Sequence, residues 1–175
     1  TQQVGELFDK IYGKSYSTSQ ISRMFESARK EVDNWLSRPL PNYYPIVYID
    51  AVFISTRRGD SVSKEAYYTI LGVRPDRTRE VLSVVNKPSE SANGWKIIFE
   101  ELKQRGVKRI DLVVSDALRG IEEAVAGVYS SSHQLCVVHL ERNVLSEIRP
   151  KEKQAISEEL KEVFNPHNPN DTIET

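Results

Sequence analysis

Two aspartates, Asp50 and Asp116, stand where strands would deliver carboxylates for chemistry. Asp50 lies inside the apolar run 44–54, and Asp116 follows closely on the mostly apolar run 110–114. Short apolar runs rich in β-branched residues predict buried strands. A carboxylate in or at the end of such a strand is costly to bury without a partner or a metal ion. The alternative for Asp50 is a structural carboxylate that accepts backbone hydrogen bonds at a bend, although no turn-forming residues flank it.

A cysteine and a histidine lie on a second short apolar run, 135–138. Cys136 is inside the run and His139 follows its last residue, so we expect a strand with the histidine at its exit. A histidine in that place is most simply a hydrogen-bonded structural residue. If the strand lies beside the one that ends at Asp116, His139 opens on the same edge and can contact a phosphate or orient a carboxylate. Cys136 is expected to pack inside the strand, and these two side chains alone are too few to hold zinc.

The positions of apolar residues predict the elements that must hold these groups. Helical spacing is present at residues 4–12, 18–37, 88–105, 121–128, 140–150 and 151–164, and strand-like runs are present at 44–54, 66–73, 79–86, 110–116 and 135–138. The polar segment 57–64 contains Gly59 and Asp60, which suit a hairpin tip. Trp95 falls on the apolar stripe of its helix, so we expect it in the core.

The resulting order, β-β-β-α-β-α-β, predicts an α/β fold: a mixed five-stranded sheet of the ribonuclease H-like type with helices on its faces. There the first and fourth strands are parallel neighbours about 4.8 Å apart, which would bring Asp50 and Asp116 together. Two ionised carboxylates this close need a cation, and two divalent ions about 3.5–4 Å apart are usual in nucleases and polymerases. Oxygen ligands favour Mg²⁺ or Mn²⁺ over zinc. Such ions support in-line phosphoryl transfer by activating the attacking hydroxyl and stabilising the leaving oxygen.

The N-terminal residues 1–41 predict a pair of helices followed by a stiff linker. Gly13 separates the helices at 4–12 and 18–37, which is compatible with a helix-turn-helix. The alternative is a plain helical hairpin that packs on the domain. The side chains that would meet DNA in the first case are Ser19, Gln20 and Arg23. Two prolines in the segment 38–41 end the second helix, so we expect a catalytic core at 42–149 and the start of a helical insertion at 150–175.

The composition is that of an ordinary globular protein. Of the 175 residues, 39% are hydrophobic and 28% are charged, and the net charge of -1 argues against a uniformly basic nucleic-acid binder. No apolar run reaches the roughly 18 residues of a membrane span, and no signal peptide is visible, so we expect an intracellular, cytoplasmic protein. The single cysteine excludes an internal disulfide. The chain begins without Met and ends without an apolar element to close a core, which favours a piece of a longer polypeptide.

Six segments of the sequence carry a family resemblance. They are YGKSYSTSQISRM, VDNWLSRPL, YPIVYIDAVFI, KEAYYTILGVRPDRTREVLSVV, FEELKQRGVKRIDLVVSDALRGIEEAV and QLCVVHLERN. In this order, and over nearly the whole chain, they resemble the mutator-type family of bacterial insertion-sequence transposases, relatives of the eukaryotic Mutator-like elements. The sequence departs from the family at Ala117, where a glycine is usual, beside a carboxylate whose local turn it can alter.

The resemblance implies site residues as well as a fold. It places the first two members of the family's Asp-Asp-Glu triad on Asp50 and Asp116, as catalytic metal ligands. Its Cys-x-x-His motif falls on Cys136 and His139. The Arg-Asn pair that commonly follows falls on Arg142 and Asn143, which become accessory residues near the site.

The function that the resemblance implies is a DNA transposase that cleaves and joins strands at element ends with Mg²⁺ or Mn²⁺. Its expected partners are terminal inverted repeats, target DNA and further copies of the protein, at the bacterial nucleoid. The triad glutamate belongs on a helix after a helical insertion; Glu158 and Glu159 come too early in the chain, so the chain alone is expected to be inactive. The alternatives are a ribonuclease H-like nuclease that does not join strands, and a non-catalytic DNA-binding or dimerisation module.

Overall fold

The computed structural model describes most of the chain. The described residues are 6–7, 9–11, 13, 15–86 and 91–164. They divide into two compact units, residues 1–41 and 42–175, which are described separately. The helix predicted at 4–12 lies only partly within the described residues, of which 6–7 and 9–11 are helical. A helix-turn-helix in this part of the chain stays a prediction, as does a separate part that starts at residue 150.

The helix of the first unit, α2 (Thr18–Ser37), has a well-formed start. Ser17 is its N-cap, and its side chain accepts from the backbone N–H of Gln20 while the Gln20 side chain accepts from Ser17. This capping box satisfies two backbone donors that would otherwise lack partners. The helix ends before Pro39 because the preceding residue, Arg38, takes the extended backbone that a following proline favours.

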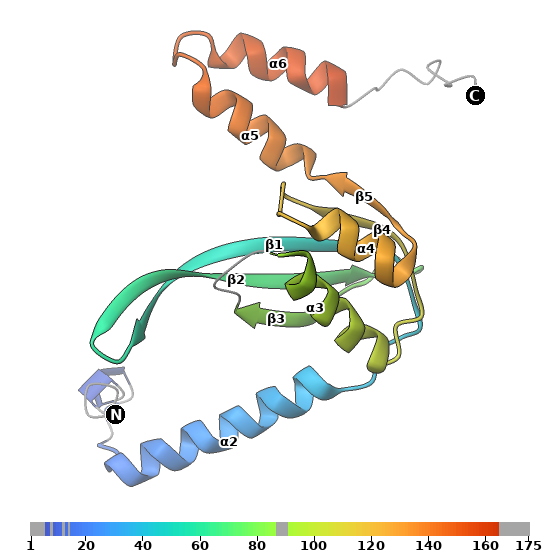
Figure 1. Cartoon of the computed structure of the whole chain (residues 1–175). Helices are drawn as coiled ribbons and strands as arrows, with labels where there is room; N and C mark the ends of the chain where they lie inside the picture. The colour runs from blue at the N-terminus through green and yellow to red at the C-terminus, as the bar shows by residue number, and fades with distance from the viewer. Residues whose placement is uncertain (1–5, 8, 12, 14, 87–90, 165–175) are drawn as a thin grey trace. The chain divides into compact units, whose positions relative to one another are not determined.

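The second unit is built on one mixed sheet. Its strands are β1 (Tyr43–Arg58), β2 (Ser61–Val73), β3 (Arg79–Asn86), β4 (Arg109–Ser115) and β5 (Ser132–Leu135). They lie in the order β3-β2-β1-β4-β5 (Figure 1). The first three strands pair antiparallel, whereas β1 pairs parallel with β4, and β4 parallel with β5. The predicted five-stranded α/β fold and its order of elements are confirmed.

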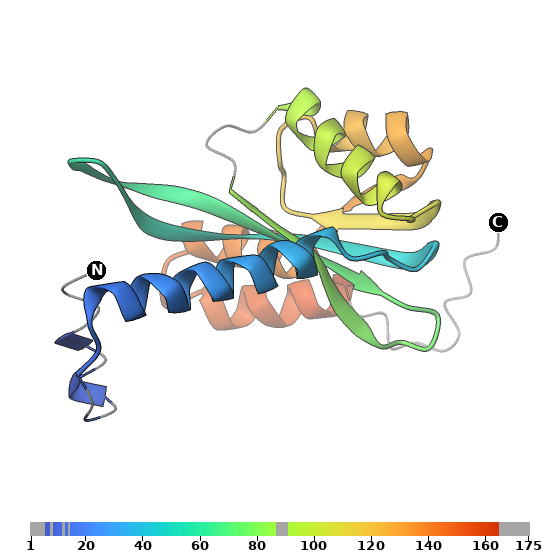
Figure 2. The same ribbon diagram turned by 90° about the horizontal axis from the view of Figure 1, so that it is seen from below.

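Two helices, α3 (Ala92–Gln104) and α4 (Ile121–Tyr129), cover one face of this sheet (Figure 2). The side chains between them and the sheet have no exposed surface; they include Val47, Ile70, Leu82, Phe99, Val113 and Val125. Trp95 is 2% exposed and meets Tyr68 edge to face at 4.9 Å, which confirms its predicted place in the core. Burying each large apolar side chain contributes about 1.5–3 kcal/mol, so this layer carries most of the stability.

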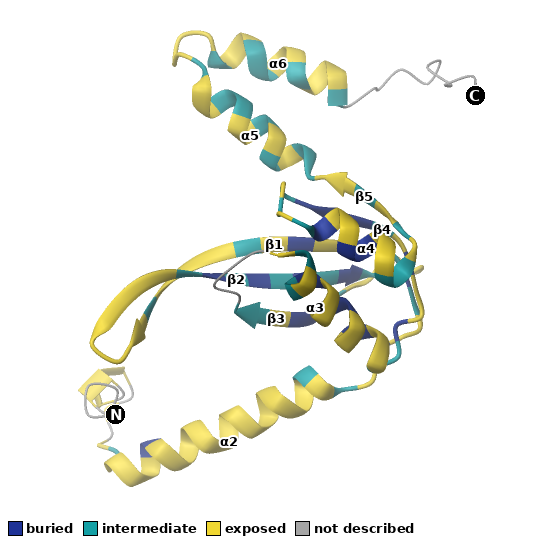
Figure 3. Cartoon of the chain, viewed as in Figure 1, coloured by how far each residue is buried: buried dark blue, intermediate teal, exposed yellow. Residues whose placement is uncertain are grey.

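Strands β1 and β2 extend past the sheet as a two-stranded ribbon. Pairing of β1 with β4 stops at Ile49 and Ser115, whereas pairing with β2 continues to Arg58 and Ser61. The ribbon exposes large apolar side chains, namely Val52, Phe53, Ile54 and Val62 (Figure 3). The prediction that 44–54 is buried on both faces is therefore wrong: Tyr48 is already 38% exposed, and beyond Ile49 no residue of this run is buried. Apolar composition did not reveal that β4 ends there and leaves β1 without a second neighbour.

The predicted strand at 135–138 is also wrong. β5 ends at Leu135, and α5 (Val137–Glu147) begins directly after its N-cap, Cys136. A four-residue apolar run has no period that separates a strand from a helix. Helix α6 (Lys153–Phe164) follows and packs on α5. Within the described part of the chain, no helix is both long and apolar enough to cross a bilayer.

Candidate metal centre

Asp50 and Asp116 lie side by side at the edge where β1 and β4 part. The last paired residues of these parallel strands are Ile49 and Ser115, and each aspartate is the residue that follows: Asp50 within β1, and Asp116 directly after the end of β4. Neighbouring parallel strands run in the same direction, so the residues that follow a paired position on each strand also lie close together. The structure thus brings together the two carboxylates singled out from the sequence. Asp50 has 59% of its side chain exposed and Asp116 has 37%.

A histidine from α5 completes the group. The Nδ1 atom of His139 lies 2.6 Å from Oδ1 of Asp116, and its Nε2 atom lies 3.7 Å from Oδ1 of Asp50. The candidate ligand atoms of the three residues all lie within 4.8 Å of one another. The prediction that His139 ends a strand is wrong. His139 lies in the first turns of helix α5.

The start of α5 is tied to the end of β4, and this explains the position of His139. The backbone N–H of Cys136 donates to the carbonyl oxygen of Ser115 at 2.8 Å. The helix then rises about one turn and places His139 over the aspartates. Cys136 therefore contributes through its backbone, and its half-buried thiol is the free thiol of a helix N-cap, not of a strand.

The donor set fits a divalent cation. Oδ1 of Asp116 and Nδ1 of His139 are buried, and neither makes a well-directed hydrogen bond with any described residue, despite their short separation. Buried polar atoms without partners are costly, and a cation bound to both atoms from one side would satisfy both. Two ligands about 2.1–2.4 Å from one ion lie at most about 4–5 Å apart, as these atoms do. Two carboxylates suit Mg²⁺ or Mn²⁺, and the imidazole of His139 offers a further ligand atom.

Comparison with known sequences identifies the family. The family model described as "Transposase, Mutator family" matches residues 1–175. The chain belongs to the Mutator family of transposases. The resemblance seen in the sequence is confirmed.

Several curated transposases of insertion sequences are similar to this Mutator-family chain. That of IS1201 from Lactobacillus helveticus is 30% identical over 169 residues, covering 96% of this chain and 46% of that protein. That of IS256 in transposon Tn4001 from Staphylococcus aureus is 31% identical over 166 residues, covering 94% and 43%. The chain thus spans less than half the length of these relatives.

Two solved structures show a distant likeness. The Drosophila P element transposase in its strand transfer complex has 13% identity and a TM-score of 0.37, over 83% of this chain and 50% of that chain. A chain of the simian T-cell lymphotropic virus intasome, solved in complex with the PP2A regulatory subunit B56 gamma, has 11% identity and a TM-score of 0.39, over 72% and 49%.

The other residues that the Mutator resemblance assigned to the site lie farther along the chain. Arg142 and Asn143 follow on α5, where both are exposed. Glu158 and Glu159 lie on α6, and within residues 15–86 and 91–164 no glutamate joins the group of Asp50, Asp116 and His139. The accessory roles and a third acidic ligand from a later segment stay predictions.

The predicted DNA-contacting residues lie in the first turns of α2, and all three are exposed. Two of them have local tasks: the Gln20 side chain caps the helix, and Nε of Arg23 donates to the carbonyl oxygen of Ser19 at 3.3 Å. The Ser-x-x-Gln spacing from Ser17 to Gln20 was a visible capping signal. It explains the helix start, whereas contact with DNA stays a prediction.

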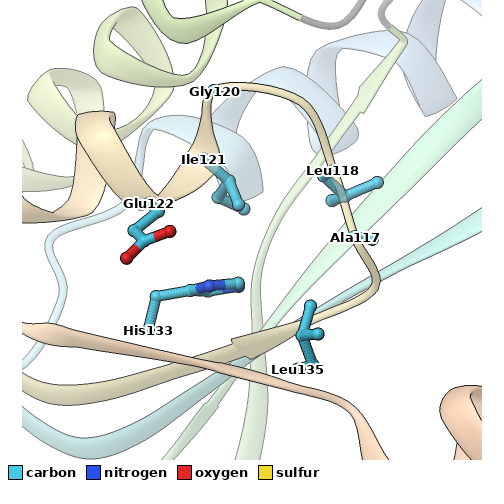
Figure 4. A pocket seen from close by; sticks show the side chains of 7 residues that line it. All are labelled: Ala117, Leu118, Gly120, Ile121, Glu122, His133 and Leu135. Atoms are coloured by element: carbon cyan, nitrogen blue, oxygen red, sulfur yellow. The ribbon is translucent and has the colours of Figure 1, made fainter.

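Sequence reasoning missed two residues next to Asp116. Ser115, the last residue of β4, is 1% exposed, and its Oγ atom lies 2.9 Å from Nε2 of His133 on β5. His133 also lines a pocket of about 390 Å³ beside the loop that follows Asp116 (Figure 4). The lining residues are Ala117, Leu118, Gly120, Ile121, Glu122, His133 and Leu135. Placing the last strand at 132–135 would have revealed the contact, because His133 pairs with Val113 in the parallel register.

Proposed function

We propose that this chain forms part of the catalytic core of a Mutator-family DNA transposase. Asp50 and Asp116 would hold the divalent metal, Mg²⁺ or Mn²⁺, with which the full-length protein cleaves DNA at element ends and transfers the strands. One observation carries the proposal: two carboxylates from adjacent parallel strands and an imidazole share one edge of the sheet in a chain of a transposase family.

Asp50, Asp116 and His139 have different proposed roles, which follow from their surroundings. A bound divalent ion supplies activation of the attacking water or 3′-hydroxyl and stabilisation of the leaving oxygen. Asp50, with the larger exposed fraction, faces the side from which DNA would approach. Asp116 is the more buried ligand, and His139 lies against both aspartates, where it orients the carboxylates. The third acidic ligand would come from a later helix of the full-length protein.

Metal binding by the chain itself tests this assignment. In isothermal titration with Mn²⁺, Asp50→Asn and Asp116→Asn should each weaken binding at least about tenfold, because each removes an anionic ligand. Asp60→Asn is the matched control: it makes the same charge change at the exposed hairpin turn, where asparagine is well tolerated. Equal losses in all three variants would show only nonspecific attraction of the ion, and unchanged binding in the first two would reject the site.

Activity has to be measured on the full-length protein. With Mg²⁺ and terminal-repeat DNA, we expect the full-length protein to cleave and rejoin strands and the 175-residue chain to do neither. Cleavage without strand transfer would favour the nuclease alternative. Full activity of an Asp50→Ala full-length protein would favour the non-catalytic DNA-binding or dimerisation module.

The first turns of α2 are the proposed DNA contact of this unit. Arg23→Ala should weaken binding of duplex DNA and reduce its salt dependence, because a phosphate contact releases counterions. Lys161→Ala on α6 removes a cation elsewhere and should leave both unchanged. Equal effects of the two substitutions would mean that Arg23 acts only through overall charge.

We further propose that several copies of the full-length protein assemble on the DNA.

A further inference from the structure

A short path of hydrogen bonds joins β5 to the backbone of Asp116. The Oγ atom of Ser115 donates to the carbonyl oxygen of Asp116 at 2.7 Å, and Nε2 of His133 lies 2.9 Å from the same Oγ. A serine hydroxyl has one proton, and here the carbonyl oxygen, which can only accept, takes it. With this assignment of the hydroxyl proton, Nε2 of His133 carries a proton and donates to Ser115.

The backbone of Asp116 depends on hydrogen-bond donors outside the sheet ladder because it lies beyond the last paired residue of β4. The paired part of β4 ends at Ser115. Beyond it, the carbonyl oxygen of Asp116 accepts from the backbone N–H of Leu118 at 2.6 Å as well as from Ser115. Two donors on one carbonyl fix the plane of that peptide, and with it the direction of the Asp116 side chain.

His133 is suited to a fixed, single-proton role. Burial lowers the pKa of His133, and the nearby carboxylate of Glu122 opposes this to a smaller degree, so the neutral ring is favoured and has only one N–H. One end of the ring meets the buried Ser115, and the ring also lines the pocket opposite Glu122 (Figure 4). The ring thus lies between Ser115 and the pocket beside the loop that follows Asp116.

We propose that His133 is a positioning residue for the metal centre: through Ser115 it holds the carbonyl of Asp116 and so aims the Asp116 carboxylate at Asp50 and His139. The effect on metal binding rests on the function proposed above. The competing explanation is that His133 only fills space on β5.

Mn²⁺ titration of the 175-residue chain separates the two explanations. His133→Leu removes the donor and should weaken Mn²⁺ binding about tenfold. His133→Gln keeps a side-chain N–H near the place of Nε2 and should retain affinity within about twofold. Rescue by glutamine but not by leucine is expected only for a hydrogen-bonding role. Equal losses in both variants, or no loss in either, would overturn the proposal.

Substitution of Ser115 tests the residue that links His133 to the carbonyl of Asp116. Ser115→Ala should weaken Mn²⁺ binding as much as His133→Leu, and the double variant should be no worse than either, because both break the same link. Ser83→Ala removes another buried hydroxyl, 8% exposed and on β3, and should leave the affinity unchanged. Additive losses in the double variant would mean that the two residues act separately. Circular dichroism of each variant checks the fold.

A metal-free measurement distinguishes failure of this inference from failure of the proposed function. Long-range ¹H–¹⁵N spectra of the wild-type chain should show His133 protonated at Nε2, and Ser115→Ala should shift the amide signal of Leu118. A neutral ring protonated at Nδ1 overturns the link even if Mn²⁺ binds normally. If the chain binds no Mn²⁺ but the Nε2 proton is present, the link stands and the metal site fails.

Discussion

At the scale of single residues, Asp116 is held more firmly than Asp50. The Asp116 carbonyl accepts two hydrogen bonds and its carboxylate lies against His139, whereas the Asp50 side chain accepts a hydrogen bond from the adjacent backbone N–H of Ala51. A firmly held and a more exposed carboxylate at one site would suit the proposed function, in which the centre has to keep its ion and also admit DNA.

The surroundings of His133 predict a pH dependence of stability. Because burial lowers its folded-state pKa below the ordinary value of 6.5, the unfolded chain binds more protons between the two values, and stability rises with pH there. The contribution of neutral His133 to stability is complete above about pH 6.5, and it is lost as the pH falls through the folded-state pKa of His133. Urea unfolding should show that the free energy of unfolding decreases less from pH 7.5 to pH 5.5 for His133→Gln than for the wild type. An equal decrease in both proteins would show that His133 does not contribute.

At the scale of elements, the tight start of α4 positions the loop that follows Asp116. Gly120 is the N-cap of α4 with φ +77°, and a Cβ atom there would lie 2.4 Å from the backbone nitrogen of Ala92. Neither the left-handed backbone nor the contact with the start of α3 tolerates a side chain.

Substitution of glycines in this element should therefore have opposite effects. Gly120→Ala should lower the free energy of unfolding by about 2 kcal/mol or more, from strain and from the clash with backbone. Gly127→Ala is the matched control: it lies in the same helix with open space around it, and should stabilise by up to about 1 kcal/mol. Thermal or urea unfolding checks both. Similar destabilisation by the two would mean that α4 does not depend on the turn at Gly120.

The ribbon of β1 and β2 should contribute little to the core. Phe99→Ala removes a fully buried side chain of α3 and should cost about 3–5 kcal/mol of unfolding free energy. Phe53→Ala removes a ribbon side chain that is 66% exposed and should change it by less than about 0.5 kcal/mol. A cost of more than about 2 kcal/mol for Phe53→Ala would show that the ribbon is covered in solution.

At the scale of the whole molecule, the candidate metal centre and the core belong to one unit. Asp50, Asp116, His139 and the helices that pack on the sheet all lie within residues 42–175. Folding and metal binding should therefore not need helix α2.

A shortened chain tests this independence. A protein that begins at Pro39, which keeps the buried Leu40, should fold and should bind Mn²⁺ within about twofold of the 175-residue chain, because every candidate ligand is retained. Circular dichroism and Mn²⁺ titration measure the two properties. Loss of Mn²⁺ binding by a well-folded shortened chain would mean that residues 1–38 support the site.

The sequence by itself determined the order of the elements, most of their positions and the two carboxylates. Period-2 and helical spacing are local properties, so the order of strands and helices, Trp95 in the core and the hairpin tip at Gly59 and Asp60 followed from it. The β-β-β-α-β-α-β order then implied that β1 and β4 are neighbours, which brought Asp50 and Asp116 together.

Only the tertiary structure decided where burial stops and which imidazole faces the carboxylates. The last buried residue of β1 is Ile49, and pairing with β4 ends at the same residue; His139 reaches the aspartates because the backbone of Cys136 is tied to Ser115. The contact of His133 with Ser115 depends in the same way on the β4–β5 register. These are contacts between residues distant in the chain, and the spacing of apolar residues within one segment contains no information about its neighbours.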